Sequence, residues 1–249
     1  MYASAIQASG FPPAKIQGAT FCCEQDKFDD GFVNDYVHRF KAVLGTNSYH
    51  RYPTAHCNGG STTLAKLLSP ESSRDQARYL SRFSIASRQQ GTPFVIGESN
   101  SVACGGQDEV SNVLGTSLWG MDYLMSLASI NVTSMNFHGG PRGIYPPIAF
   151  NSTSAGSAPD VRPLYYGALL FSETVANHSV LLGLEAGHSD NLQVRTWMAR
   201  DGITGGLRLL VIHKDPNATE AALVGFTADG ASSHVVASVD ASGYTPPPC

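Results

Sequence analysis

The stretch TPFVIGESNSVACGG, residues 92–106, places an apolar run and a glycine directly before a carboxylate, and small and polar residues after it. The run TPFVIGE is typical of a buried strand, because it is short and apolar and is bounded by residues that favour turns. Glu98 therefore stands at the carboxyl end of this strand. The glycine-rich continuation predicts a loop, so we expect Glu98 to project into a pocket lined by loops.

Strand-length and helix-length patterns alternate on both sides of this stretch. Strands are predicted at residues 15–23, 47–53, 92–98 and 132–140, and helices at 32–44, 72–90, 109–130 and 162–176. Such alternation implies parallel strand pairing with right-handed crossovers, which is α/β architecture. The Pro-, Gly- and Ser-rich stretch between the last strand and the last helix predicts a loop.

Beyond about residue 180 the periodicity changes to that of short strands. Four β-type runs, separated by turn signals such as DG, GG and ADG, cover residues 191–200, 207–215, 220–228 and 233–240. They indicate part of an antiparallel all-β sandwich. We therefore expect an α/β region at residues 1–178 and a β-domain at residues 179–249.

Composition limits the classes of partner. The chain has 249 residues, 42% of them hydrophobic and 14% charged, with a formal net charge of −4. It has no sustained basic run, which argues against nucleic acid as the main partner and against a polybasic membrane anchor. No apolar run has the length of about 20 residues that spans a bilayer. The first residues lack the basic start and apolar core of a signal peptide, so any export signal is expected upstream of this chain.

The cysteines show neither CxxC spacing nor a Cys/His ladder, so a structural zinc site is not expected. Their odd number leaves at least one thiol unpaired, and the pairing stays open; Cys104 is interpreted as structural. Sequons at Asn131, Asn151, Asn177 and Asn217 are compatible with a secreted glycoprotein or with chance. Asn131 lies within an apolar run, where a glycan is not expected to fit.

Polar side chains recur where the predicted strands end. His50, Arg51 and Tyr52 close one strand, Glu98 closes the next, and His138 closes the one after. In a β/α barrel the carboxyl ends of the strands surround a single mouth, from which catalytic groups are drawn. The pattern thus predicts one site that contains all of these residues.

Four motifs resemble glycoside hydrolase family 79, the β-glucuronidase and heparanase-like enzymes: HRYP, GESNS, NFHGG and LYYGALLF. The similarity runs from about residue 15 to about residue 180. It implies a (β/α)8 barrel followed by a β-sandwich, with residues 1–178 supplying barrel strands 5 to 8. It also implies a secreted enzyme that hydrolyses uronic-acid glycosides with retention and needs no metal or organic cofactor.

By this resemblance Glu98 is the nucleophile. Retaining hydrolysis also needs a carboxylic acid that protonates the leaving oxygen, about 5 to 5.5 Å from the nucleophile. The resemblance places this acid in an Asn-Glu pair after barrel strand 4, and the chain contains no such pair. The acid is therefore expected upstream. Donors from Ser99, Asn100, Ser101 and the Gly105–Gly106 backbone are expected to favour the ionised form of Glu98.

The other site residues each have a structural alternative. Tyr52, Tyr145 and the Gly105 N–H match positions near the sugar-carboxylate pocket, although buried tyrosines with satisfied hydroxyls are common. His50, His138 and Asn100 are assigned to sugar binding, although strand-end histidines are often structural. Arg51 or Arg142 is a candidate partner for a substrate carboxylate or else a solvated loop charge. Trp119, Met121 and Met125 fit a helix core instead.

Two functions remain open from the sequence. The first is part of an enzyme that hydrolyses β-glucuronides of glycans. The second is a catalytically silent product that binds carbohydrate or another protein, because half a barrel leaves two sheet edges open. The lack of an acid/base favours the second for the isolated chain, and the nucleophile loop favours descent from the first.

Overall fold

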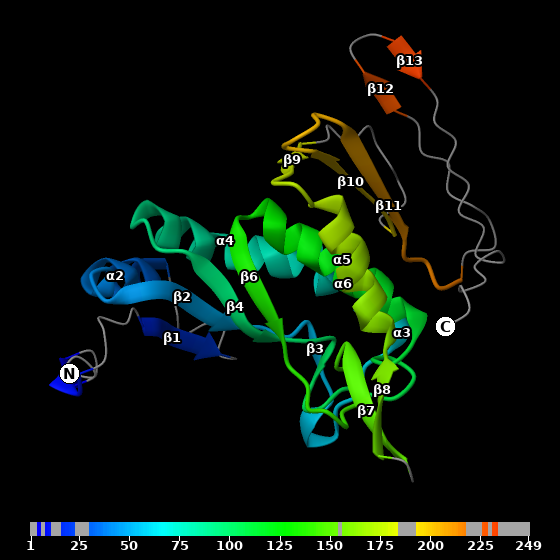
Figure 1. The fold of residues 1–249 in the computed structure, drawn as a ribbon, viewed down its shortest axis with the longest axis horizontal. Coiled ribbons are helices and arrows are strands. Elements are labelled where there is room, and N and C mark those ends of the chain that lie inside the picture. Colours follow the sequence, from blue (N-terminus) through cyan, green and yellow to red (C-terminus); the bar gives the residue numbers. More distant parts are fainter. Residues whose placement is uncertain are drawn as a thin grey trace.

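The structure, a computed structural model, describes residues 4–5, 8–10, 16–22, 30–153, 156–183, 193–217, 226–228 and 231–233. Its centre is a four-stranded sheet in the order β1-β2-β4-β6 (Figure 1). The strands are β1 (Ile16–Cys22), β2 (Leu44–His50), β4 (Phe94–Ser99) and β6 (Val132–Phe137). All neighbouring pairs run parallel, so the predicted parallel pairing is confirmed.

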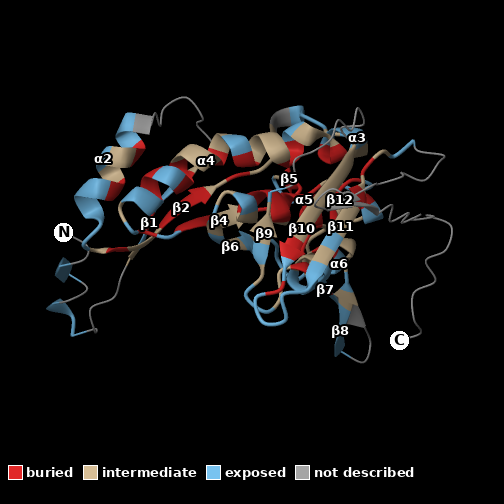
Figure 2. Cartoon of the chain, turned by 90° about the horizontal axis from the view of Figure 1, so that it is seen from above, coloured by how far each residue is buried: buried red, intermediate tan, exposed pale blue. Residues whose placement is uncertain are grey.

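Helices connect the strands and pack against them. The long ones are α2 (Asp30–Phe40), α4 (Arg74–Gln89), α5 (Leu114–Ser129) and α6 (Pro163–Thr174). A short helix α3 (Leu64–Leu68) and two 3-10 turns, η1 (Cys57–Gly59) and η2 (Pro70–Ser72), lie between β2 and α4. Helix α2 contacts α4, α4 contacts α5, and α5 contacts α6. Helix order thus follows strand order, and buried residues gather where helices and strands meet (Figure 2).

Aromatic side chains fill the core between the sheet and the helices. Tyr49 of β2 stacks on Phe83 of α4 with ring centroids 4.8 Å apart. Within α5, Trp119 and Tyr123 stack at 5.2 Å. All four side chains are fully buried. Burial of a large apolar side chain contributes about 1.5–3 kcal/mol, so this cluster is a principal source of stability for the layer.

Helix α5 begins at Leu114, later than the predicted start at residue 109. The residues before it form a turn, in which the Ser111 N–H donates to the Gln107 carbonyl at 2.8 Å. Glu109, within this turn, has a φ of 59°, a left-handed conformation that a right-handed helix cannot contain, so the helix begins after it. Met121 and Met125 are buried together with Trp119, which confirms the prediction that this segment is core.

The predicted loop between β6 and α6 was wrong in part, because it contains a hairpin. Strand β7 (Ile148–Thr153) pairs antiparallel with β8 (Gly156–Val161). Composition masks this hairpin, since Pro159 lies opposite Phe150 and proline is disfavoured in central strands. Both strands of a two-stranded ribbon are edges, and an edge tolerates proline.

The C-terminal region contains antiparallel strands, as predicted. Strands β9 (Val180–Leu182), β10 (Val194–Arg200) and β11 (Leu207–His213) form a sheet in the order β11-β10-β9. Strand β12 (Phe226–Ala228) pairs with β13 (Ala231–Ser233). Most of the run predicted at 233–240 and all of residues 241–249 lie outside the described residues. The two-sheet sandwich and the boundary at residue 178 stay predictions.

A buried charge cluster joins this C-terminal sheet to the helices. The Lys214 ammonium donates to Asp122 Oδ2 at 2.6 Å and to Ser73 Oγ at 3.1 Å. Lys214 and Asp122 are both 0% exposed, so water cannot replace either partner. On the other carboxylate oxygen, Oδ1, Arg195 Nε donates at 3.2 Å and Trp197 Nε1 at 3.1 Å.

Burial acts on the two charges in different ways. Burial alone raises the pKa of Asp122, but the Lys214 ammonium, the Arg195 guanidinium and hydrogen bonds from Lys214 and Ser73 outweigh it and leave that pKa below its usual value. For Lys214, burial lowers the pKa and the Asp122 carboxylate offsets only part of this effect. Asp122 is thus held as a carboxylate by its cationic neighbours.

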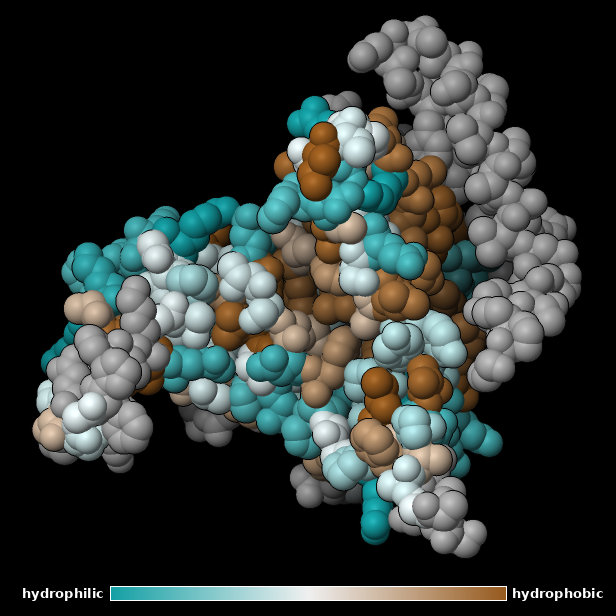
Figure 3. Space-filling model, viewed as in Figure 1, coloured by the Kyte–Doolittle hydropathy of each residue, from teal (hydrophilic) through white to brown (hydrophobic). Residues whose placement is uncertain are grey.

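Apolar side chains also reach the surface next to this junction. They belong to α6 and β11: Tyr166, Leu169, Leu170, Leu207 and Leu209. In Figure 3 apolar residues gather on this side of the molecule.

Candidate active site

Glu98 lies near the carboxyl end of β4, next to the end of β2. In the parallel register His50 lies opposite Glu98, and the Arg51 N–H donates to the Glu98 carbonyl at 3.0 Å. Gly97 permits this close approach, because a Cβ at this position would lie 2.4 Å from Ser48 Oγ and 3.3 Å from the His50 ring. The glycine before Glu98 is therefore required by the contact between the two strands.

Two side chains from the end of β2 hold the Glu98 carboxylate. The Tyr52 hydroxyl donates to Oε1 at 2.9 Å, and His50 Nδ1 lies 3.5 Å from Oε2. The Glu98 side chain is 33% exposed, so a ligand can still reach the carboxylate. Burial raises the pKa of Tyr52, and the hydrogen bond to Glu98 raises it further. The Tyr52 hydroxyl therefore keeps its proton and remains a donor to Glu98.

His138 and Tyr145 form a second pair from the loop after β6. His138 Nδ1 and the Tyr145 hydroxyl lie 2.5 Å apart. The pKa of Tyr145 is raised, mainly by burial and also by the negative charge of Glu98. Hydrogen bonds with Tyr52 and from the Gly105 backbone act in the opposite direction and offset part of this increase. These influences place Tyr145 beside Tyr52, Glu98 and Gly105. The structure thus brings the tyrosines, histidines and glycine predicted for the site into one cluster around Glu98.

Asn100 lies behind this cluster rather than facing a ligand. It is fully buried, and its Nδ2 donates to the His138 carbonyl at 2.7 Å and to the Tyr145 carbonyl at 3.0 Å. Its Oδ1 accepts from the Ser101 N–H at 2.7 Å. Direct contact between Asn100 and a sugar, which the sequence suggested, is not supported by this geometry. Asn100 instead fixes the loop that carries His138 and Tyr145.

The serines that flank Asn100 are not the donors that the sequence suggested for Glu98. Ser99 is fully buried, and the Ser101 hydroxyl donates to Ser111 Oγ at 2.9 Å. Side chains alternate along an extended segment, which turns these residues away from Glu98. Tyr52, a residue distant in sequence, donates to the carboxylate instead.

The two candidate arginines differ. Arg51 is buried, with its Nε donating to Gln76 Oε1 at 2.5 Å and its guanidinium 4.6 Å from the centroid of the Tyr79 ring. Both contacts are with residues of α4, so Arg51 is not the solvated loop charge that the sequence left open. Arg142 is exposed in the loop after β6.

The loops after β2 and β4 are joined beside the site, a feature that sequence reasoning missed. Strand β3 (Thr54–Ala55) pairs with β5 (Val102–Ala103), and a disulfide joins Cys57 to Cys104 with Cα atoms 5.8 Å apart. His56 Nε2 also donates to the Cys104 carbonyl at 2.8 Å. The signal was present, since each cysteine follows the end of one of two neighbouring strands by a few residues.

The glycines that follow Cys104 have a conformational reason. Cys104, Gly105 and Gly106 have φ values of 71°, 99° and 86°, the left-handed region that favours glycine. A Cβ at Gly106 would also lie 3.1 Å from the Tyr145 side chain. The loop thus turns sharply after β5 and lets its backbone approach Tyr145.

Comparisons with known proteins point to one class of enzyme. No family model matches the chain. A β-glucuronidase of Aspergillus niger is 30% identical over 131 residues, which are 50% of this chain and 24% of the relative. A β-glucuronidase of Neurospora crassa is 33% identical over 87 residues, 34% of this chain and 15% of the relative. The chain therefore aligns with less than a quarter of the length of each of these relatives.

Solved glycosidases share the fold at low sequence identity. A 4-O-α-L-rhamnosyl-β-D-glucuronidase from Fusarium oxysporum, solved with Rha-GlcA, has a TM-score of 0.64 at 19% identity, covering 80% of this chain and 40% of that chain. A GH51 arabinofuranosidase from Xanthomonas axonopodis has a TM-score of 0.59 at 12% identity, covering 90% and 52%. By sequence and fold together, the chain is related to glycoside hydrolases of the glucuronidase type.

Proposed function

We propose that this chain is the C-terminal part of a retaining β-glucuronidase of glycoside hydrolase family 79, with Glu98 as the nucleophile. The observation that carries the proposal is the partly exposed Glu98 carboxylate at the end of β4, held between the Tyr52 hydroxyl and His50. The similarity to fungal β-glucuronidases supports the substrate class, a glucuronic-acid-containing glycan.

In the proposed reaction, Glu98 attacks the anomeric carbon while a general acid protonates the departing glycosidic oxygen. Water then attacks the glycosyl ester, the same acid acting as base, which releases the sugar with retained configuration and regenerates the Glu98 carboxylate. Within the described part of the chain, the hydrogen bonds and ion pairs of the Glu98 side chain include no second carboxylate. We assign the general acid to a part of the protein outside these residues; Glu24, an alternative source, also lies outside them.

The geometry divides the roles of the two tyrosines. Tyr52 donates its single hydroxyl proton to Glu98, so we assign it to positioning the nucleophile rather than to binding the uronate. Tyr145 lies beside it and remains a candidate donor to the sugar carboxylate, whereas the Gly105 N–H, the third donor expected from the sequence, is engaged by the Tyr145 oxygen. His138, which lies against the Tyr145 hydroxyl, would orient that group.

The sheet supports the proposed barrel. Among the described residues, β1 pairs only with β2 and β6 pairs only with β4. In a closed barrel both edges would pair with further strands, which we take to be barrel strands 4 and 1, with β1, β2, β4 and β6 as strands 5 to 8. The three-stranded C-terminal sheet would be part of the sandwich that follows the barrel.

We propose a secreted glycoprotein. The Cys57–Cys104 disulfide is typical of proteins that fold in an oxidising compartment. Asn131 lies at an exposed turn between α5 and β6 with φ 62°, so the expectation that a glycan could not fit there was wrong. Asn177 and Asn217 are exposed as well. None of the described helices has the length and apolar character needed to cross a bilayer.

The test uses a form of the protein extended upstream and a chromogenic aryl β-glucuronide. Glu98→Gln keeps the shape of the side chain but removes its charge, so turnover is expected to fall by several orders of magnitude. For Glu98→Gly, added azide is expected to restore turnover and to give a glycosyl azide of inverted configuration, because azide replaces the missing nucleophile. Gln76→Glu on α4 is the control, since it is the reverse exchange of an amide for a carboxylate in a side chain of the same size. Full activity of Glu98→Gln would exclude Glu98 as nucleophile.

The alternative is a catalytically silent protein that binds carbohydrate. It rests on the same observation that no second carboxylate joins the Glu98 cluster among residues 30–153 and 156–183. If the extended form bound glucuronides in calorimetry yet released no product, and Glu98→Gln left binding unchanged, this alternative would replace the enzyme.

A further inference from the structure

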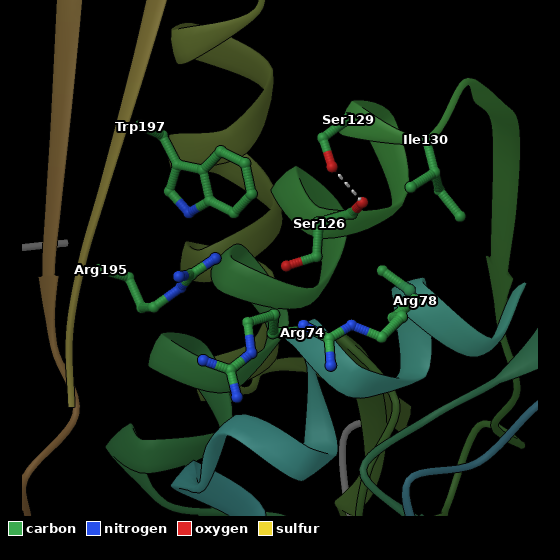
Figure 4. A pocket seen from close by; sticks show the side chains of 8 residues that line it. Arg74, Arg78, Ser126, Ser129, Ile130, Arg195 and Trp197 are labelled. Atoms are coloured by element: carbon green, nitrogen blue, oxygen red, sulfur yellow. Dashed lines mark hydrogen bonds between the residues drawn. The ribbon is translucent and has the colours of Figure 1, made fainter. Parts of the chain in front are cut away.

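An open pocket lies where the C-terminal sheet meets α4 and α5, and none of its residues belongs to the Glu98 cluster. Its volume is about 200 Å³. Figure 4 shows guanidinium groups from α4 and β10 directed toward it. The lining consists of Arg74, Ala77, Arg78, Ser126, Ser129, Ile130, Arg195 and Trp197.

The pocket carries an excess of positive charge. Arg74 and Arg78 lie one turn apart on α4, where like charges repel each other. Arg74 Nε pairs with Asp75 at 3.1 Å. The structure shows no hydrogen bond or ion pair for the guanidinium of Arg78 among the residues that it describes. Of these two neighbouring cations, only Arg74 is therefore paired with a carboxylate.

The third guanidinium does not remove this excess. Arg195 Nε pairs with Asp122 at 3.2 Å, but the Asp122 carboxylate is shared with the buried Lys214 ammonium at 2.6 Å. Arg195 also lies over the Trp197 ring, 5.1 Å from its centroid. The Asp122 carboxylate therefore serves two cations, and its charge faces the interior rather than the pocket.

A buried hydroxyl lies in the same wall. Ser126 is 2% exposed, and its Oγ has no hydrogen-bond partner among the described residues. In Figure 4 the Ser126 hydroxyl points toward the space between Arg195 and Arg78. A hydroxyl can donate to an anion, and a buried polar atom without a partner carries a free-energy cost that such a ligand would relieve.

We propose that this pocket binds a compact oxyanion, namely a sulfate, a phosphate or the carboxylate of a sugar acid. Guanidinium groups match the paired oxygens of such anions, and three arginines from two different elements line this pocket. The volume equals that of roughly seven water molecules at about 30 Å³ each, enough for an inorganic anion or one sugar acid. Because Arg74 and Arg78 belong to α4 and Arg195 to β10, the bound anion would also hold the sheet against the helices.

The test is a titration of the 249-residue chain with inorganic sulfate at constant ionic strength, kept with chloride, while the melting temperature is followed. Sulfate is expected to raise the melting temperature with saturation, since a ligand that binds only the folded state stabilises it. Arg78→Ala should weaken the fitted affinity at least tenfold. Arg88→Ala, an exposed arginine of the same helix outside the pocket, is the control and should leave the affinity unchanged.

A second arm identifies the source of the anion and adds an independent signal. Sodium glucuronate and a glucuronic-acid disaccharide replace sulfate, and the fluorescence of Trp197 is recorded; the other tryptophan, Trp119, is fully buried. Tighter binding of the sugar acids than of sulfate would assign the site to a glycan, and the reverse would assign it to a free inorganic anion. The proposal would be overturned if Arg78→Ala and Arg88→Ala changed the sulfate affinity equally, or if the melting temperature rose linearly with sulfate without saturation. Glu98→Gln should bind sulfate normally, so this result is independent of the proposed catalysis.

Discussion

Replacement of Lys214 by Met should destabilise the protein strongly, because it leaves the Asp122 carboxylate in the interior without its nearest cation. Lys214 and Asp122 are both 0% exposed, with 2.6 Å between Nζ and Oδ2. Methionine has a similar volume, so the variant removes the charge without opening a large cavity. The loss of stability should therefore be caused by the unpaired charge rather than by poor packing.

The expected size follows from the remaining contacts. Breaking a buried ion pair by removal of one partner costs about 3–5 kcal/mol. Arg195 still donates to Oδ1 at 3.2 Å, which places the cost near the lower limit, about 3 kcal/mol. For a chain of this length that corresponds to a fall in melting temperature of roughly 6–12 °C. Arg195→Met should cost less, since that side chain is 24% exposed and water can take its place.

Urea unfolding, followed by tryptophan fluorescence, measures these changes in free energy. The double variant Asp122→Asn/Lys214→Met removes both charges and should recover more than half of the loss. If Lys214→Met cost less than about 1 kcal/mol, or if the double variant were no more stable than the single one, the buried charge would not be the cause.

Acid titration gives an independent check on the same cluster. The pKa of Asp122 is lower in the folded state than in the unfolded state, where it is about 3.9. The stabilisation that ionised Asp122 gives to the folded state is therefore fully present above about pH 3.9, and it is lost as the pH falls from there through the lower folded-state pKa. Asp122→Asn should remove this part of the acid destabilisation, so its stability should fall less between neutral pH and about pH 3 than that of the unchanged chain.

Two further changes test how the candidate active site is built. Gly97→Ala places a Cβ 2.4 Å from Ser48 Oγ and should lower the free energy of unfolding in urea by about 1–3 kcal/mol. Gly140→Ala is the control, since its Cβ would have no atom within 4 Å, and it should leave the free energy of unfolding almost unchanged. Equal losses for the two variants would contradict the close approach of the strands. The disulfide between Cys57 and Cys104 spans 47 residues, so replacement of both cysteines by serine should lower the free energy of unfolding by up to about 4 kcal/mol. An unchanged free energy of unfolding would show that the disulfide does not constrain the unfolded chain.

The parallel sheet was predictable because its signals are local. Each strand carries its own apolar run, and a carboxyl-end residue such as Glu98 follows from the strand boundary alone. Parallel strands place their carboxyl ends at one edge, so His50 and Tyr52 were expected beside Glu98. Which of them donates to the carboxylate depends on side-chain direction, which a strand pattern does not contain.

Other features depend on partners distant in sequence. The hairpin at Ile148–Val161 was missed because its proline and serine content is that of a loop. Lys214 sits in the run HKD, typical of charges at a strand end, and nothing nearby indicates that it is buried against Asp122, 92 residues earlier. Such pairs form only when the C-terminal sheet packs on the helices.

The disulfide and the β3–β5 pairing also limit how the rim of this site can change during evolution or in the laboratory. Residues 54–57 and residues 101–104 are bound to each other by two backbone strands, a covalent bond and the His56 hydrogen bond. A library that randomises one of these segments alone will consist mostly of sequences that clash with the other. Changes in substrate selectivity should therefore arise through paired substitutions across the two segments, or through the separate loop around Tyr145, which has no such link to residues 54–57 within the described chain.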